Sequence, residues 1–306
     1  MRDLLRQATG AIDQVLLGKQ QAVKLAVACI LAKGHLLIED LPGMGKTTLS
    51  QALARVMGLS YQRIQFTSDL LPGDILGSSV FDRNSGGFAF HPGPIFAELV
   101  LADEINRATP KSQSALLEAM EEGQVTVDGA TRPLPDPFFV IATQNPASQG
   151  GTFALPESQL DRFLMRLSLG YPDTKAEKSL LLGGTGRARL DTLKPVMTRA
   201  QLQQLQAAVP QITASEAVID YILRLVGRSR ESHLCAWGLS PRASLGLLAS
   251  ARAWALLDNR SYVLPEDVQA VFPVVVGHRL RASDDPSGHG GGDGLAQRLL
   301  AEVPAI

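Results

Sequence analysis

The sequence lacks the features that mark several protein classes. Its two cysteines, Cys29 and Cys235, lie far apart and form no C-x-x-C pair, and its five histidines show no metal-ligand spacing. We therefore expect both cysteines to be reduced residues in or near the core. No apolar run approaches the ~20 residues that span a bilayer, and the opening residues lack the apolar core of a signal peptide. A cytoplasmic protein is the expectation.

An excess of charge of one sign is also missing. The 29 basic and 30 acidic residues leave a formal net charge of −1, and no long run of Lys and Arg occurs. This balance argues against a dedicated nucleic-acid groove or a surface for anionic membranes. What is present is a chain of 306 residues of which 45% are hydrophobic, enough for one large or two medium domains with a real core.

The stretch E-D-L-P-G-M-G-K-T-T at residues 39–48 is the first local signal of function. It nearly matches the phosphate-binding pattern G-x-x-x-x-G-K-[ST], but Asp40 stands where the first glycine belongs. A short apolar strand at residues 36–38 precedes the stretch and an amphipathic helix at 48–57 follows it, which is the context this pattern requires. The alternative is a surface turn before an ordinary amphipathic helix.

Each residue type in this loop has a use in binding phosphate. Glycines let the backbone come close, the start of a helix offers N–H groups, and Lys46 counters the negative charge. We expect the Asp40 carboxylate to point away from the phosphates, because an unpaired negative charge facing them would weaken binding. The predicted nucleotide-binding residues are Gly43, Met44, Gly45, Lys46, Thr47 and Thr48, and the Thr47 hydroxyl is also a predicted Mg²⁺ ligand.

Two later apolar strands also end in polar side chains. In L-V-L-A-D-E, residues 99–104, we predict that Asp103 binds the nucleotide's Mg²⁺ and that Glu104 polarises the attacking water. In F-F-V-I-A-T-Q-N-P, residues 138–146, Asn145 would orient water against the γ-phosphate. A solvated turn is the plain alternative in both places. A glutamate directly after the magnesium ligand can polarise water, which favours hydrolysis of the nucleotide over transfer of its phosphoryl group to another acceptor.

The order of predicted elements indicates an α/β protein with a helical second part. Short β-prone runs alternate with helical segments as far as Tyr171, which favours a parallel sheet. A turn-rich insertion occupies residues 68–94, and Asp128-Gly129 between β-prone residues predicts a hairpin. Beyond Tyr171 the patterns predict only helices, at residues 175–182, 199–209, 215–229, 241–257 and 265–276.

We predict two domains from this change of composition. Residues 1–182 would form the nucleotide-binding α/β domain and residues 183–306 a helical domain. The glycine-containing stretch at 183–189 is expected to be an interdomain loop, and the Gly-rich stretch at 283–294 a linker before a last helix. Ser240 is the expected cap of the helix that starts at Pro241.

Several longer motifs occur in a fixed order along the chain. They read E-D-L-P-G-M-G-K-T, P-G-P-I-F-A-E-L-V-L-A-D-E-I-N-R-A, S-Q-S-A-L-L-E-A-M-E-E-G-Q-V-T-V-D-G, A-T-Q-N-P, L-P-E-S-Q-L-D-R-F and L-S-P-R-A. Together they resemble the MoxR family of AAA+ ATPases from about residue 15 to residue 276. The resemblance implies a P-loop AAA+ parallel sheet core, a helix 2 insert at 68–94, a pre-sensor 1 hairpin at Asp128-Gly129 and an all-α lid domain.

The resemblance also implies roles for individual residues. Asn145 is similar to the sensor 1 residue, and Gly18 in V-L-L-G-K would run past the adenine. Arg162 in L-D-R-F resembles the arginine finger that reaches the neighbouring subunit's nucleotide, with Arg166 as a second candidate. Arg242 in S-P-R-A resembles sensor 2, which would contact the γ-phosphate. Without the resemblance, Arg162 would be interpreted as a surface arginine paired with Asp161, and Arg242 as an ordinary arginine at a helix start.

The function implied is that of a Mg²⁺-dependent ATPase that remodels or matures protein partners. The resemblance implies a ring, usually a homo-hexamer, ATP and Mg²⁺ as cofactors, and a protein client, in some cases one with a von Willebrand factor A domain. A nucleic-acid motor of helicase type is the alternative, and steep salt dependence of duplex binding would favour it. A third reading is a scaffold that binds ATP and barely hydrolyses it.

Overall fold

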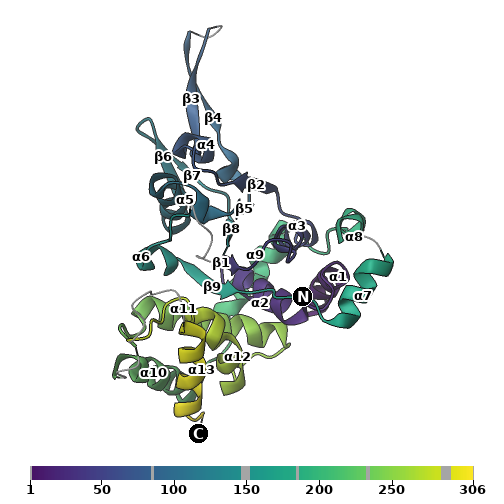
Figure 1. Ribbon diagram of the computed structural model, residues 1–306, viewed down its shortest axis with the longest axis vertical. Helices are drawn as coiled ribbons and strands as arrows, with labels where there is room; N and C mark the ends of the chain where they lie inside the picture. Colours follow the sequence, from purple (N-terminus) through teal and green to yellow (C-terminus); the bar gives the residue numbers. More distant parts are fainter. Residues whose placement is uncertain are drawn as a thin grey trace.

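The computed structural model describes residues 2–83, 86–145, 152–183, 186–231, 235–283 and 291–305 of the protein. Five parallel strands form the central sheet in the order β2-β5-β8-β1-β9 (Figure 1). The strands are β1 His35–Glu39, β2 Tyr61–Gln65, β5 Leu99–Asp103, β8 Phe139–Gln144 and β9 Phe163–Leu167. The predicted α/β fold with a parallel sheet is confirmed.

Helices cover both faces of the sheet, so its strands are apolar on both sides. Within β1, Leu36 and Ile38 join one core and Leu37 joins the other, as the period-2 alternation of a strand requires. The first core lies under α1, α2 and α3, and the second lies under α4 and α5. These helices are α1 Arg2–Asp13, α2 Gln20–Leu31, α3 Lys46–Val56, α4 Pro72–Leu76 and α5 Pro110–Glu122.

Two hairpins extend from the α/β core (Figure 1). The insertion after β2 holds α4, the hairpin of β3 (Gly77–Asp82) and β4 (Gly87–Pro92), and the short turn η1 (Pro94–Phe96). The second hairpin, β6 (Gln124–Val127) and β7 (Ala130–Pro133), follows α5. Its turn residues Asp128 and Gly129 have φ of 52° and 75°, the left-handed pair that an Asp-Gly turn favours. The hairpin predicted there is confirmed.

Beyond β9 the described residues form helices. Ser240 caps α11, since its hydroxyl accepts a hydrogen bond from the Ala243 N–H at 3.2 Å, as predicted. In Figure 1 the helices α10 to α13 gather below the sheet. The remaining helices are α6 Glu157–Leu160, α7 Thr174–Gly183, α8 Gly186–Thr192, α9 Arg199–Ala208, α10 Glu216–Glu231, α11 Pro241–Leu257, α12 Pro265–Val276 and α13 Gly292–Glu302, with short turns η2 Ile105–Arg107 and η3 Val209–Gln211.

The structure corrects the expected interdomain loop at residues 183–189, because α8 begins at Gly186. This helix packs on α3: Leu190 is buried, and Arg55 donates to the Leu190 carbonyl at 2.6 Å and to Asp191 at 3.1 Å. The sequence patterns also did not predict the strand β9 or the helix α1. Within the expected linker at 283–294, residues 284–290 lie outside the described residues, and the last part is corrected because α13 begins at Gly292. The domain boundary at 182/183 stays a prediction.

Two further expectations concern burial and membrane contact. Among the described residues Cys29 and Cys235 form no disulfide, and both are buried, which agrees with the predicted core role. Among the residues that the structure describes, none of the helices has the length and apolarity needed to cross a bilayer.

Candidate active site

The carboxyl ends of three neighbouring strands meet at one edge of the sheet, which we call the carboxyl edge. Ile38 of β1 pairs with Thr143 of β8, and Ala102 of β5 pairs with Ala142 of β8. The residues that follow these positions therefore lie side by side. In this way the fold brings together the phosphate loop, the two predicted carboxylates and Asn145.

The phosphate loop has a backbone suited to an anion. Gly43 and Gly45 have φ of 86° and 95°, in the left-handed region that glycine enters without strain. The residue before α3 is Gly45, which has no side chain that could cap the first-turn N–H groups of Lys46, Thr47 and Thr48. An uncapped helix start after a curved glycine loop fits a phosphate group.

Lys46 lies in the middle of the polar groups. Its ammonium donates to the Asp40 carbonyl at 2.6 Å and to Asn145 Oδ1 at 3.2 Å. Burial lowers the Lys46 pKa, while the charges of Asp40, Asp103 and Glu104 act in the opposite direction. A buried ammonium among oxygen acceptors at a helix start is placed to neutralise phosphate charge.

The Asp40 carboxylate is occupied by backbone amides of a distant segment. Its Oδ2 accepts from the N–H groups of Leu169 at 2.6 Å and Gly170 at 2.8 Å, and its Oδ1 accepts from the Leu41 N–H at 3.0 Å. The carboxylate therefore faces the chain that follows β9, and its predicted orientation away from the phosphates stays a prediction. The residue in place of the first glycine ties the phosphate loop to that segment.

The segment before α2 lies against this same region. Lys19 donates to the carbonyls of Gly170 at 2.8 Å and Tyr171 at 2.6 Å, and Leu16 lies beside Gly45. Gly18 has φ of 72°, and a side chain there would stand 3.0 Å from Ala176 of α7. The predicted adenine-side residue is thus within a segment that contacts the phosphate loop.

The two carboxylates are both held by hydrogen bonds. Asp103 Oδ1 accepts from the Thr143 hydroxyl at 2.6 Å, and Asp103 Oδ2 accepts from Arg63 Nε at 3.0 Å and Nη2 at 2.6 Å. Glu104 Oε1 accepts from Asn145 Nδ2 at 3.3 Å. Glu104 Oε2 accepts from Arg107 at 2.9 Å and from Gln65 at 3.2 Å.

Arg63, Gln65 and Arg107 are contacts that the sequence analysis missed. The first two lie on β2, which pairs with β5 so that Gln65 stands opposite Asp103. Only the position of β2 beside β5 reveals this, because nothing in the sequence states which strands are neighbours. The contact between Arg107 and Glu104 could have been predicted from the sequence, because Arg107 lies three residues after Glu104 in the turn η2.

The donor set at this edge fits a hard cation. The predicted ligands Asp103 and Thr47 carry oxygen donors, which Mg²⁺ prefers. The Asp103 side chain already forms an ion pair with Arg63 at 2.6 Å, and the Arg63 side chain is 47% exposed. A cation at Asp103 would therefore share this carboxylate with the guanidinium or displace it.

Two of the arginine candidates, Arg162 and Arg242, lie at the opposite edge of the sheet, which we call the amino edge. Arg162 precedes β9, whose first residue, Phe163, pairs with His35 at the start of β1. The strand β9 has 5 residues, which at ~3.3 Å each separate its ends by about 15 Å. Arg162 is therefore remote from Lys46 of its own chain.

Arg162 and Arg242 meet on a single carboxylate there. Arg162 Nε lies 3.0 Å from Glu121 Oε2, and Arg242 contacts Glu121 Oε1. Asp161 instead pairs with Arg279 at 2.6 Å and with Arg242 at 3.8 Å. The ion pairs of Arg242 thus place it beside Arg162 at the amino edge, and not at the Lys46 cluster.

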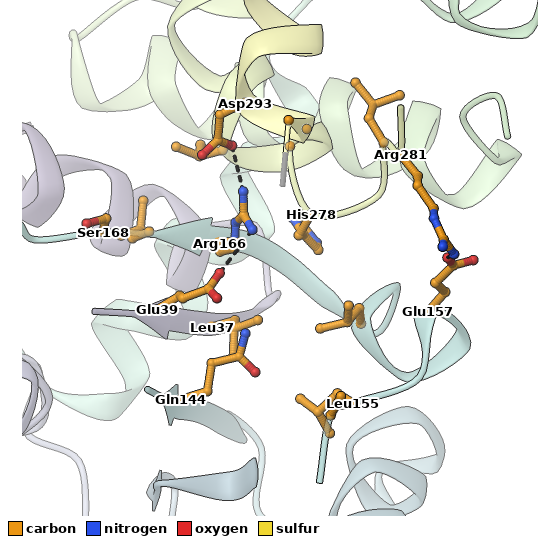
Figure 2. Close-up of a pocket in the computed structure, with 18 of the residues that line it drawn as sticks. Leu37, Glu39, Gln144, Leu155, Glu157, Arg166, Ser168, His278, Arg281 and Asp293 are labelled. Carbon is orange, nitrogen blue, oxygen red and sulfur yellow. Dashed lines mark hydrogen bonds and ion pairs between the residues drawn. The ribbon is translucent and has the colours of Figure 1, made fainter. Parts of the chain in front are cut away.

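Arg166, the second finger candidate, joins the sheet to the last helix. Its guanidinium lies 3.0 Å from Glu39 and 2.7 Å from Asp293, and Figure 2 shows it between these two carboxylates. Both contacts border a cavity of ≈ 710 Å³ between the sheet, α6, α12 and α13, which also has Asn145 in its wall. These contacts give Arg166 a role in holding α13 to the sheet.

The comparisons with known proteins agree with this fold. Residues 35–165 match the ATPase family associated with various cellular activities (AAA), and residues 227–298 match the AAA lid domain. The chain is 46% identical over 280 residues to the uncharacterized protein YeaC of Bacillus subtilis, covering 92% of this chain and 88% of YeaC. It is 40% identical over 287 residues to Chaperone MoxR1 of Mycobacterium tuberculosis, covering 90% of this chain and 75% of that protein. A crystal structure from Cytophaga hutchinsonii, assigned as an ATPase, superposes with a TM-score of 0.88 at 34% identity over 99% of this chain and 95% of that one.

Proposed function

Because the chain belongs to the MoxR family of AAA+ ATPases and is therefore an ATP-hydrolysing enzyme, we propose that it couples Mg²⁺-dependent hydrolysis to the remodelling of protein partners in a ring. The observation that carries this proposal is the hydrogen-bonded cluster at the carboxyl edge. There Asn145 contacts both Lys46 and Glu104, at 3.2 and 3.3 Å. Cation, amide and carboxylate are already arranged around one point.

The residues of this cluster have separate tasks in the proposed reaction. Bound ATP and Mg²⁺ would supply the γ-phosphate and neutralise part of its charge. Lys46 and the first turn of α3 hold the phosphates. Glu104 orients and deprotonates the water, and Asn145 fixes the direction of Glu104. Arg107 and Gln65 bind the other oxygen of Glu104, so that oxygen must be released before it can accept a proton.

The amino edge would complete the site of a neighbouring subunit. Arg162 and Arg242 share one carboxylate and are remote from their own phosphate loop, which supports a role in trans for both. The family resemblance implies that Arg242 contacts the γ-phosphate of bound ATP. We retain this role, with the nucleotide of the neighbouring subunit as the one that Arg242 contacts. An arginine supplied from outside stabilises transition-state charge during phosphoryl transfer.

A protein client is the substrate that the relatives favour. One of them carries the name Chaperone MoxR1, which supports work on a polypeptide and not on a small molecule. The two hairpins that extend from the core, β3–β4 and β6–β7, are the proposed client-facing elements. A hexameric ring, a von Willebrand factor A partner and the division into domains 1–182 and 183–306 are part of this proposal.

The proposal is tested most directly by Glu104→Gln. Loss of the general base should lower steady-state phosphate release by ~10²- to 10⁴-fold, while ATP binding is retained because the phosphate loop is untouched. Glu118→Gln is the matched control, since Glu118 is an exposed carboxylate on α5. Unchanged phosphate release by Glu104→Gln would refute the catalytic assignment. Co-purification of the ATP-loaded Glu104→Gln protein with a polypeptide would identify the client.

A further inference from the structure

A buried threonine lies between the two carboxylates of the active site. Thr143 in β8 is 0% exposed. Its hydroxyl donates to Asp103 Oδ1 at 2.6 Å and accepts from the Glu104 N–H at 2.8 Å. A hydroxyl has one proton to donate and lone pairs to accept, so this single group satisfies partners on two consecutive residues.

Glu104 needs such a contact because of its backbone conformation. It has φ of 56° and ψ of 49°, in the left-handed region where a glutamate is rare. A residue in this region persists when its surroundings hold it there. The turn lets the Glu104 side chain reach Asn145 instead of continuing along β5. The hydrogen bond from the Glu104 N–H to Thr143 fixes the start of that turn.

Asp103 is held by the same hydroxyl from the other side. The bond from Thr143 to Oδ1 is short and charge-assisted, and it fixes the carboxylate so that Oδ2 faces Arg63. Thr143 is β-branched, which restricts its side-chain rotation and keeps the hydroxyl in one place. The relative orientation of Asp103 and Glu104 thus depends on one fixed group in the neighbouring strand.

We propose that Thr143 is a positioning residue for ATP hydrolysis, whose hydroxyl sets the relative orientation of Asp103 and Glu104. This inference rests on the proposed function of those two residues. It differs from a packing role, because packing depends on the shape of the side chain, which valine shares, whereas positioning depends on the hydroxyl.

The test compares Thr143→Val with Thr143→Ser. Valine keeps the shape and removes the hydroxyl, which should lower kcat on the order of 100-fold, because small misplacement of catalytic groups has effects of that size. The Kd for ATP should stay near the wild-type value, because the phosphate loop is unchanged. Serine keeps the hydroxyl and should restore most of kcat.

A packing control separates positioning from stability. Val140→Ala removes a buried side chain from the same strand β8 without touching the hydroxyl. It should lower the thermal unfolding temperature and leave kcat near wild type. If Thr143→Val does not fold, Thr143→Cys takes its place, since a thiol is a weak hydrogen-bonding group, and the same loss of kcat is expected.

Each outcome decides the inference. A Thr143→Val protein with wild-type kcat, an equal loss in Thr143→Ser, or an equal loss in Val140→Ala would overturn the positioning role. The proposed function fails separately, when Glu104→Gln keeps wild-type turnover. Loss of turnover in Glu104→Gln together with full activity in Thr143→Val would overturn only the role of Thr143.

Discussion

The two edges of the central sheet differ in how their charged groups are held. At the carboxyl edge, Lys46, Asp103 and Asn145 are buried. At the amino edge, the side chains of Arg162 and Arg242 are 26% and 49% exposed. Buried hydrogen-bonded groups are fixed before any ligand arrives, which is the arrangement that stabilises transition-state charge most effectively.

The half-buried Arg162 and the exposed Arg242 have the opposite property. An ion pair that water can reach contributes little, ~0 to 1 kcal/mol, so both arginines can leave Glu121 for a stronger anion at little cost. The difference indicates that one edge is a fixed site and that the other is a pair of cations available to a neighbour.

The largest effect is expected from the amino edge. Arg162→Ala should lower kcat by ~10³- to 10⁵-fold, as loss of an arginine finger does in other nucleotide hydrolases. Mixing this protein with Lys46→Ala protein should restore activity at mixed interfaces, where an intact phosphate loop meets an intact arginine. Phosphate release by the mixture measures this. Arg298→Ala, at an exposed arginine of α13, is the control. If the mixture shows no recovery of phosphate release although the two proteins assemble together, Arg162 does not act in trans.

The next effect concerns the pH dependence of stability at the amino edge. His35 Nδ1 accepts from the Val140 N–H at 3.0 Å, so its Nε2 donates to the Met120 carbonyl at 3.3 Å, and this joins the sheet to the end of α5 next to Glu121. Burial lowers the His35 pKa from 6.5 to about 4, against the opposing effect of the Met120 bond. The unfolded chain therefore takes up a proton at higher pH than the folded chain does.

The sign of the expected change follows from that difference. The contribution of neutral His35 to stability is complete above pH 6.5 and is lost as the pH falls from 6.5 toward about 4. The loss from this group is about 3 kcal/mol. Urea denaturation at a series of pH values should show it, and His35→Gln should flatten the slope. His91→Gln, at an exposed histidine, should leave the slope unchanged, and an equal slope in all three proteins would contradict the assignment.

The smallest effect is expected from Glu121→Gln. The hydrogen bond from Arg242 lowers the Glu121 pKa, so the carboxylate is ionised and paired at neutral pH. If the Glu121 carboxylate only holds Arg162 and Arg242 back from the neighbouring site, its removal should raise kcat/KM up to about fivefold. The gain is limited because an exposed ion pair contributes ~1 kcal/mol or less. Glu122→Gln at the next, exposed position is the control. A loss of activity in Glu121→Gln would show instead that this carboxylate aligns the arginines for the neighbour.

Much of the fold was predictable because its signals are local. The bounds of α11 and α12 follow from proline at the first helical position and from apolar spacing, and the Asp128-Gly129 turn follows from backbone preference. The strand β9 was missed because F-L-M-R-L is short and carries Arg166. The helix α8 was missed because its glycine-containing start favoured a loop, and packing on α3 decided otherwise.

Local sequence patterns are enough to locate the parts of the site that lie in one stretch of chain. The glycines and Lys46 of the phosphate loop, and the carboxylates at the end of β5, are each placed by a strand that ends in a turn. The contacts between distant stretches depend on the tertiary fold. Asp40 meets Leu169 across 129 residues, Thr143 meets Asp103 across 40, and Arg242 meets Glu121 across 121. Which strands and helices become neighbours is set by the burial of whole faces in two cores, and no local pattern records it.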